Sequence, residues 1–334
     1  MAVSCGSGKY EVVLDNQHYL RELLESITLT DSLSSIAYKA QIKMPATADF
    51  PGITNGQQCR VSGIPFGGAS MAYLLHPGVV WDIDSITKGK KHLTAIVYDS
   101  TIYLEKSEDE YLFPDGQTAS QRIKQYAADW EISIDLSNFP DTKVLLAKTG
   151  IGSSHRGYIY DMIMSDLKES VSKGGTMYRP RITANGLELY EIGSNSTVWV
   201  LESVESIEQN RTLEGTVTRV KVLGKETEGQ RTPVLALVNG ETAKYGTLQK
   251  ILQDEKITST AEAKRKGQAM LTGVQETFTV TGPDINTIRA GDKVVLNSLS
   301  LIVTDISHEL GTPGHMTAQL ANAEYVRRKY YAKN

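Results

Sequence analysis

Residues 301–322 read LIVTDISHELGTPGHMTAQLAN, and this stretch decides the fold because it occurs twice in the chain. Shifted by 223 positions, residues 79–99 (VVWDIDSITKGKKHLTAIVYD) align with residues 302–322 without a gap. Each copy predicts two strands around a polar, glycine-containing turn, because apolar and polar side chains alternate with the period of a half-buried strand. Six of the 21 aligned pairs are identical: Val80/Val303, Asp82/Asp305, Ile83/Ile306, His92/His315, Thr94/Thr317 and Ala95/Ala318.

The similarity continues upstream of each copy. NGQQCRV at residues 55–61 resembles AGDKVVL at residues 290–296, with extra residues following in the first copy. A repeat at opposite ends of a chain predicts two related β-domains with a different region between them. We place the first β-domain at residues 1–105, the middle region at residues 106–197 and the second β-domain at residues 198–334.

The middle region predicts a compact α/β insert. Thr118 opens a capping box, Thr-x-x-Gln, before a helix-periodic segment, and a second such segment ends at Gly174-Gly175. We expect a strand at residues 131–136 and a hairpin that turns at Asn185-Gly186. Two short helices are expected within the second β-domain, at residues 246–255 and 259–271.

Two segments are candidates for contacts with other proteins. Residues 63–78 predict an exposed loop that the second copy lacks, and its apolar residues suit an interface. The tail at residues 325–331 is basic and aromatic; it could contact nucleic acid or an acidic partner, although a frayed, solvated terminus is favoured. The interface candidates are Ile64, Pro65, Phe66, Arg327 and Arg328.

Composition is that of a soluble globular protein, with 40% apolar and 22% charged residues. The net charge of −4 gives no support for a nucleic-acid-binding protein. We interpret Cys5 and Cys59 as free thiols in a reducing compartment. No signal peptide and no membrane segment are expected, because no apolar run approaches about 18 residues.

No motif for catalysis, a metal or a cofactor emerges from the residue spacing. The six histidines lack the i, i+4 spacing of a metal site, and there is no Cys-x-x-Cys. His92 and His315 occupy equivalent repeat positions, either as a paired ligand or switch or, as we favour, as an inherited strand-start residue. Asp82 and Asp84 could in principle be the paired carboxylates of a glycosidase. Two residues two positions apart also share one face of a strand, and we favour this structural explanation of their spacing. We therefore expect no catalytic residues, no metal and no cofactor.

Several stretches together resemble a known family. They are ITLTDSLSSIAYKAQIKMPA (27–46), LTAIVYDSTIYLEKS (93–107), DGQTASQRIKQYA (115–127), SIEQNRTLEGTVTRVKVLG (206–224) and the AGDKVV, LIVTDISHELG and HMTAQLANAE segments of the C-terminal copy. The chain resembles baseplate hub proteins of the XkdQ/YqbQ family from phages and phage-tail-like particles. It is also similar in plan to the central hub of contractile tails and to late-control D proteins.

The resemblance implies a β-rich α+β fold with two tail-tube-like β-barrels flanking the α/β insert. It implies a homotrimeric ring that joins the six-fold tail tube to a spike or needle, with baseplate and tape-measure proteins as further partners. DNA would pass without sequence-specific binding. The protein would lie in the bacterial cytoplasm during assembly and then in the tail. The alternative is a cell-wall hydrolase or a carbohydrate-binding component of the same particle.

Overall fold

A computed structural model describes residues 9–47, 50, 52–149, 155–226, 228–254 and 257–332. Cys5 lies outside these residues. The chain forms two compact units: the first comprises Met1–Glu208 with Phe278–Asn334, and the second comprises Gln209–Thr277. The chain passes into the second unit within strand β13 (Ser206–Thr212) and returns within β17 (Gln275–Pro283).

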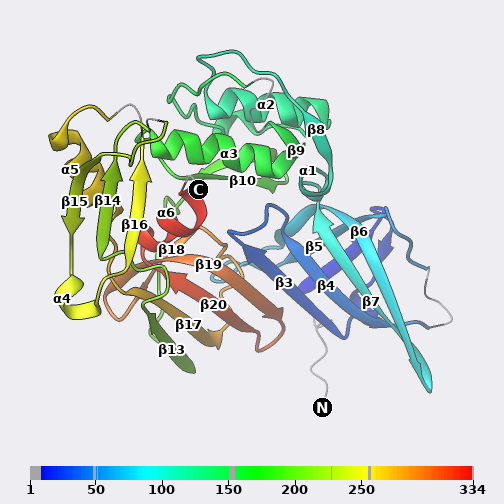
Figure 1. The fold of residues 1–334 in the computed structure, drawn as a ribbon. Coiled ribbons are helices and arrows are strands. Elements are labelled where there is room, and N and C mark those ends of the chain that lie inside the picture. The colour runs from blue at the N-terminus through cyan, green and yellow to red at the C-terminus, as the bar shows by residue number, and fades with distance from the viewer. Residues whose placement is uncertain are drawn as a thin grey trace. The chain divides into compact units, whose positions relative to one another are not determined.

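One 13-stranded sheet contains both copies of the repeat (Figure 1). Its order is β13-β17-β20-β19-β3-β4-β7-β6-β5-β1-β2, with β18 beside β19 and β12 beside β18. The remaining strands of this sheet are β1 (Tyr10–Leu14), β2 (His18–Tyr19), β3 (Ser26–Ser32), β4 (Lys39–Pro45), β5 (Gln58–Gly63), β6 (Ala72–Lys88), β7 (Lys90–Asp99), β12 (Trp199–Val200), β18 (Lys293–Leu296), β19 (Leu299–Leu310) and β20 (His315–Ala321).

The protein is β-rich as predicted, but the described strands do not close into two barrels. The strand order has two open ends, and the two copies of the repeat share one sheet through the pairing of β3 with β19. Each copy nevertheless has its own apolar core. In β4, buried Ala40, Ile42 and Met44 alternate with more exposed residues, so the alternation read from the sequence does place one sheet face in a core.

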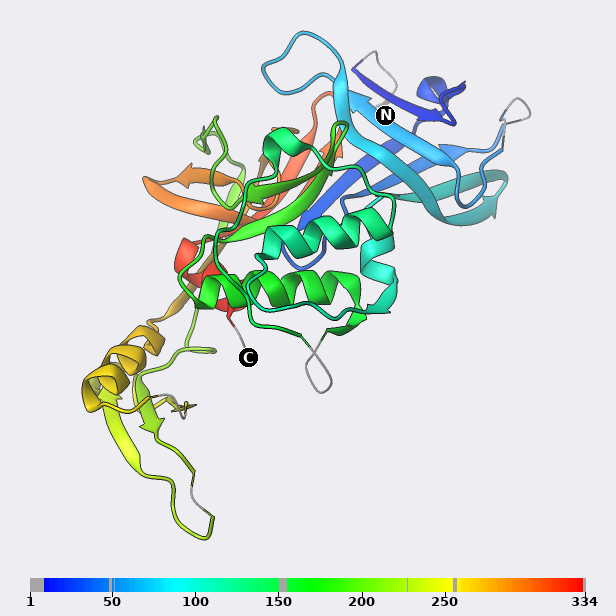
Figure 2. The same ribbon diagram turned by 90° about the horizontal axis from the view of Figure 1, so that it is seen from above.

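The insert packs two helices against a hairpin, as the α/β prediction required. Helix α1 (Ile102–Lys106) leads into the insert across the proposed boundary at residue 106. The elements of the insert are β8 (Glu108–Glu110), α2 (Ala119–Asp129), a 3-10 turn (Leu136–Asn138), β9 (Arg156–Tyr158), α3 (Ile159–Ser172), β10 (Tyr178–Thr183) and β11 (Gly186–Glu191). Figure 2 shows α2 and α3 side by side. The capping box at Thr118 and the turn before Gly186 are confirmed.

Two predicted elements are wrong. Residues 131–136 form no strand: only Ile134 bridges Leu187, and the Asp135 carboxylate accepts from the amide of Ser137, which turns the chain into the 3-10 segment. Residues 246–255 hold β16 (Gln249–Gln253) in place of a helix. The exposed loop is also shorter than predicted, because β6 already begins at Ala72.

The second unit is a small α/β structure that the sequence analysis did not separate from the second β-domain. Strands β14 (Arg219–Leu223), β15 (Val234–Asn239) and β16 form a sheet in the order β15-β14-β16. Helix α5 (Thr260–Met270) confirms the helix predicted at residues 259–271 and is capped by Ser259, whose side chain accepts from the amide of Glu262. Helix α4 (Thr242–Tyr245) is short. The unit has its own core around Val220 and Val222.

Candidate assembly interface

The two repeated hairpins have the same strand register. Asp82 pairs with Ile96 in the first hairpin, and Asp305 pairs with Gln319 in the second, which are the same positions after the shift of 223. Both ladders also shift register one residue earlier, so each contains a β-bulge at the equivalent place. Bulges are retained features of related strands. The predicted equivalence of the two hairpins is confirmed.

The repeat also includes one further strand in each copy: β3, which pairs with β4, and β13, which pairs with β17. The Glu25 amide donates to the carbonyl of Lys43 on β4, and the Glu205 amide donates to the carbonyl of Thr281 on β17. Each glutamate then pairs with the equivalent histidine, Glu25 with His92 at 2.9 Å and Glu205 with His315 at 3.2 Å. Strand β3 of the first copy of the repeat therefore corresponds to β13 of the second copy, with a shift of 180.

This correspondence was missed in the sequence, although a signal exists. Glu-Ser-Ile occurs at residues 25–27 and again at residues 205–207. The shift differs between the strands because the second unit is inserted between β13 and β17, whereas β3 and β4 follow each other closely. A repeat interrupted in this way escapes a search at one fixed shift.

The two copies meet where β19 pairs with β3 in antiparallel register, from Asp305 opposite Ser32 to Leu310 opposite Ile27. A buried charge cluster stands at this junction. The Asp31 carboxylate accepts from Arg179 Nη2 at 3.0 Å and from Arg289 Nε at 2.6 Å, and so ties β3 to the insert and to the second copy. Burial alone would raise the pKa of Asp31, but the two guanidinium groups outweigh it and hold the pKa at about 2.

The strands equivalent to β19 and β3, which are β6 and β13, each have a stretch of edge that pairs with no described strand. Residues 82–88 of β6 pair with β7 on one side and with no described strand on the other, and β13 stands at the other end of the sheet order. The exposure of side chains differs accordingly. Ile27 of β3 is 1% exposed, whereas the equivalent Ile207 of β13 is 39% exposed. An open strand edge is a template for pairing with another chain.

The predicted interface loop contacts its own chain. Asn286 accepts from the Phe66 amide at 2.8 Å and donates to the carbonyl of Ile64 at 3.0 Å. The ring of Phe66 meets Trp199 edge to face, with centroids 5.3 Å apart, yet 48% of Phe66 remains exposed. Ile64 and Pro65 are partly buried. A role of Ile64, Pro65 and Phe66 in contacts with other proteins stays a prediction.

The basic tail is not a frayed terminus. Residues Ala323–Tyr331 form helix α6, whose first turn is capped by Asn322, and Tyr331 is buried with its hydroxyl donating to the Tyr178 carbonyl at 2.8 Å. Arg327 donates to the carbonyl of Val171 at 3.0 Å, and Arg328 lies 3.5 Å from Glu324. The helix packs through an apolar face formed by Val326, Tyr330 and Tyr331. The prediction of a solvated terminus gave weight to the basic residues and overlooked this face.

The titratable groups form no evident metal centre in the part of the chain that the structure describes. No group of three or more His, Cys, Asp or Glu residues there could hold a metal ion. His308 is fully buried between the carboxylate of Asp284 and the carbonyl of Ile288, which is a packing arrangement inside a core. Within the same residues, no helix is long and apolar enough to span a membrane.

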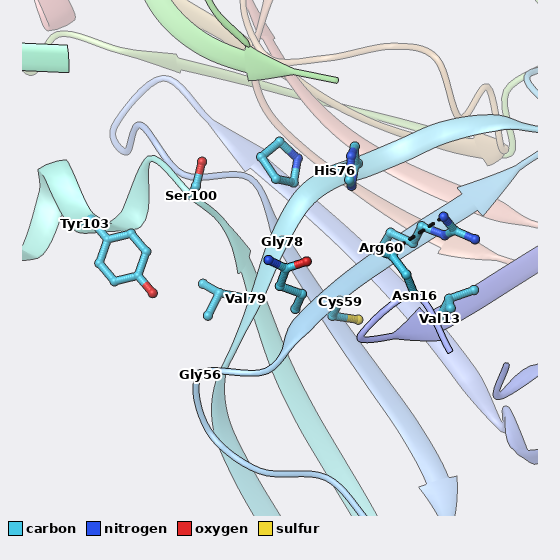
Figure 3. Close-up of a pocket in the computed structure, with 12 residues that line it drawn as sticks. Val13, Asn16, Gly56, Cys59, Arg60, His76, Gly78, Val79, Ser100 and Tyr103 are labelled. Atoms are coloured by element: carbon cyan, nitrogen blue, oxygen red, sulfur yellow. Dashed lines mark hydrogen bonds between the residues drawn. The ribbon is translucent and has the colours of Figure 1, made fainter. Parts of the chain in front are cut away.

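A surface cavity of about 450 Å³ opens on the first copy of the repeat. Figure 3 shows Tyr103 and Ser100 on one side of it and Arg60, held by Asn16, on the other. Cys59 also lines the cavity, but burial raises the pKa of its thiol to about 12, so the thiolate nucleophile does not form at neutral pH. Burial, together with the charge of Arg60, lowers the pKa of His76.

Comparison with known proteins identifies relatives across most of the chain. A family model described as YQBQ-like matches residues 27–317. Two Bacillus subtilis (strain 168) proteins are each 30% identical: uncharacterized protein YqbQ over 162 residues, 47% of this chain and 47% of that protein, and phage-like element PBSX protein XkdQ over 168 residues, 49% of each. The matched region thus spans about half the length of these curated relatives.

The fold also recurs among solved structures. The prophage MuSo2 43 kDa tail protein from Shewanella oneidensis is similar with a TM-score of 0.66 and 13% identity, over 95% of this chain and 99% of that one. At this level of identity the similarity shows a shared fold.

Proposed function

The chain belongs to the YQBQ-like family, and on that premise we propose that it is a structural hub protein of a phage tail or phage-tail-like particle. Three copies form a ring that joins the six-fold tail tube to the central spike or needle. Each chain supplies two copies of one β-unit, so three chains supply six quasi-equivalent units to a six-fold tube. The tube, spike, baseplate and tape-measure proteins are its partners. The protein is assembled in the bacterial cytoplasm and then remains in the tail.

One observation carries this proposal: the junction between β3 and β19 within the chain has an unfilled equivalent. The strand equivalent to β19 is β6, and the strand equivalent to β3 is β13. Pairing of β6 from one chain with β13 of the next chain would repeat the same junction between chains. A head-to-tail contact of this kind closes into a ring when its rotation allows. The closed barrel that the described strands of one chain do not form would then be the wall of the ring.

The charge of the chain fits a channel better than a DNA-binding surface. Tight DNA binding depends on clustered Lys and Arg that displace counterions from phosphates. With a net charge of −4, the ring would let DNA or tape-measure protein pass without gripping it. The proposed role is structural and non-enzymatic. Clearing of a peptidoglycan gel by the purified chain would favour the hydrolase alternative instead.

Paired cysteines test the proposed junction at residue level. His308 of β19 lies opposite Leu29 of β3 within the chain. Ser85 of β6 is equivalent to His308 by the shift of 223, and Gln209 of β13 is equivalent to Leu29 by the shift of 180. The proposed junction therefore places Ser85 of one chain opposite Gln209 of the next chain. In a Cys5→Ser background, Ser85→Cys with Gln209→Cys should form a disulfide between copies and give a product of three chains after oxidation. Directly opposite residues on neighbouring strands bring their Cβ atoms close enough for this bond.

The matched control moves one cysteine by a single residue. Asp84→Cys with Gln209→Cys places the two side chains on opposite faces of the sheet, because side chains alternate along a strand. This variant should stay uncrosslinked under the same conditions. Equal crosslinking of both variants, or none in either at high protein concentration, would refute the proposed pairing.

A further inference from the structure

The cavity on the first copy has an equivalent place on the second copy. Gly56 and Gly291 both have left-handed backbone angles, with φ of 87° and 93°. Each glycine amide donates to the hairpin strand beside it, Gly56 to the carbonyl of Val80 at 2.7 Å and Gly291 to that of Val303 at 2.8 Å. These matching contacts fix the equivalence of the two places independently of the sequence identity.

In the second copy this place is filled by the chain itself. The Gly193 amide donates to the carbonyl of Gly291 at 2.8 Å, and the hydroxyl of Tyr190 donates to Asp292 at 2.8 Å. Ile192 lies so close that a Cβ on Gly291 would be 3.0 Å from it. Residues 190–193 therefore cover the glycine. They form the end of β11 and the turn that follows it, and β11 contributes Leu187 and Leu189 to the core of the insert.

In the first copy the same place is open. The Gly56 carbonyl accepts no hydrogen bond from the described part of the chain. Tyr103 is 42% exposed and Trp81 is 37% exposed, and their rings meet at 5.8 Å beside the cavity wall formed by Val79. Exposed aromatic side chains next to a concave surface are typical of protein interaction sites.

The charge of the cavity selects its occupant. Arg60 is the one residue with a full charge at neutral pH among those that line it. Its Nη1 donates to the side-chain oxygen of Asn16 at 3.2 Å, and its buried Nε has no partner among the described residues. A carboxylate on the occupant would pair with the positive charge of the Arg60 guanidinium.

We propose that this cavity is a docking site for an acidic and aliphatic segment of a partner protein. Its backbone N–H bonds the Gly56 carbonyl, an aliphatic side chain lies against Val79 and Tyr103, and a carboxylate meets Arg60. Residues 190–193 do not supply the occupant, because in each chain they already cover Gly291. The occupant is instead a segment of another protein. Peptide segments are commonly recognised through such backbone bonds and side-chain pockets.

A synthetic peptide tests the site on the isolated full chain, so its result does not depend on the ring. The probe is a fluorescein-labelled peptide with the sequence of residues 188–195, ELYEIGSN, followed by fluorescence anisotropy. We expect saturable binding to the wild-type chain, and at least about 10-fold weaker binding to Arg60→Ala and to Tyr103→Ala. Tyr158→Ala, which truncates an exposed tyrosine of the insert, should bind as the wild type does.

A charge exchange separates recognition from loss of folding. Arg60→Glu should reject the peptide, and a peptide in which both glutamates are lysine should bind Arg60→Glu better than the wild type. Absence of saturable binding, equal binding of a scrambled peptide, or no effect of either alanine variant would overturn the proposal. So would self-association of the chain that Tyr103→Ala abolishes, because the occupant would then be a second copy.

Discussion

Asp31 is the residue on which the junction between the two copies depends most. Its carboxylate is fully buried and joins Arg179 of the insert to Arg289 of the second copy. The guanidinium of Arg289 also stacks on the ring of Tyr38, 3.6 Å from its centre. Removing the negative charge would leave two buried cations without compensation, which is far more costly than losing an exposed ion pair.

Asp31→Asn should therefore lower the free energy of unfolding by about 3–5 kcal/mol at pH 7. Asp84→Asn, a change of the same kind at an exposed site, should alter it by less than about 0.5 kcal/mol. Urea denaturation of both variants measures the difference. A loss at Asp31 no larger than that at Asp84 would show that the cluster does not hold the junction.

The same residue gives the stability a defined dependence on acid. The pKa of Asp31 in the folded chain, about 2, lies below its ordinary value of 3.8. The contribution is thus fully present above about pH 4 and is lost as the pH falls through 2, amounting to about 2 kcal/mol. In Asp31→Asn this part of the acid dependence should disappear.

Sequence reasoning could not have found this cluster. Arg179 and Arg289 lie 148 and 258 positions from Asp31 along the chain, and no local pattern links them. The open cavity was missed for a related reason, since its walls come from separate strands and a loop. By contrast, the capping box at Thr118 was predictable because all of its atoms lie within one turn of helix.

At the scale of elements, α6 joins the end of the chain to the insert. Val326, Tyr330 and Tyr331 of this helix belong to the insert core, although they follow the second copy of the repeat. The preceding strand, β20, ends at the Asn322 cap, just as β7 ends at Asp99 before α1. The helix thus fixes the second copy against the insert.

Tyr331→Ala should destabilise the chain by about 3–5 kcal/mol, because it removes a buried ring and leaves the Tyr178 carbonyl without its donor. Arg328→Ala should cost less than about 1 kcal/mol, since its ion pair with Glu324 is partly exposed. Thermal unfolding followed by circular dichroism compares the two. Similar melting temperatures for Tyr331→Ala and Arg328→Ala would show that the tail does not stabilise the fold and behaves as a solvated terminus.

The elements that sequence reasoning got wrong show where local patterns mislead. Leu248, Ile251 and Leu252 have helical spacing, yet β16 forms there because it pairs in parallel with the distant β14. Strand pairing between distant segments overrides local propensity. The repeated hairpins were predictable because two copies of one pattern, Asp82 with Asp305 among them, supported each other.

At the scale of the whole molecule, the repeat links fold to proposed assembly. The order of β-region, insert and second β-region was predictable, while the division at residues 106 and 198 remains a proposal. The second unit was not foreseen, because its insertion between β13 and β17 leaves strands on both sides that continue one sheet. The ring adds only one step: the junction inside the chain is repeated between chains.

Electron cryomicroscopy of the assembled particle will show whether the chain forms the proposed ring. We predict three chains around the axis, at the junction of tube and spike, with β6 of each chain beside β13 of the next chain. Six copies at that level, or a position outside the tube, would contradict it.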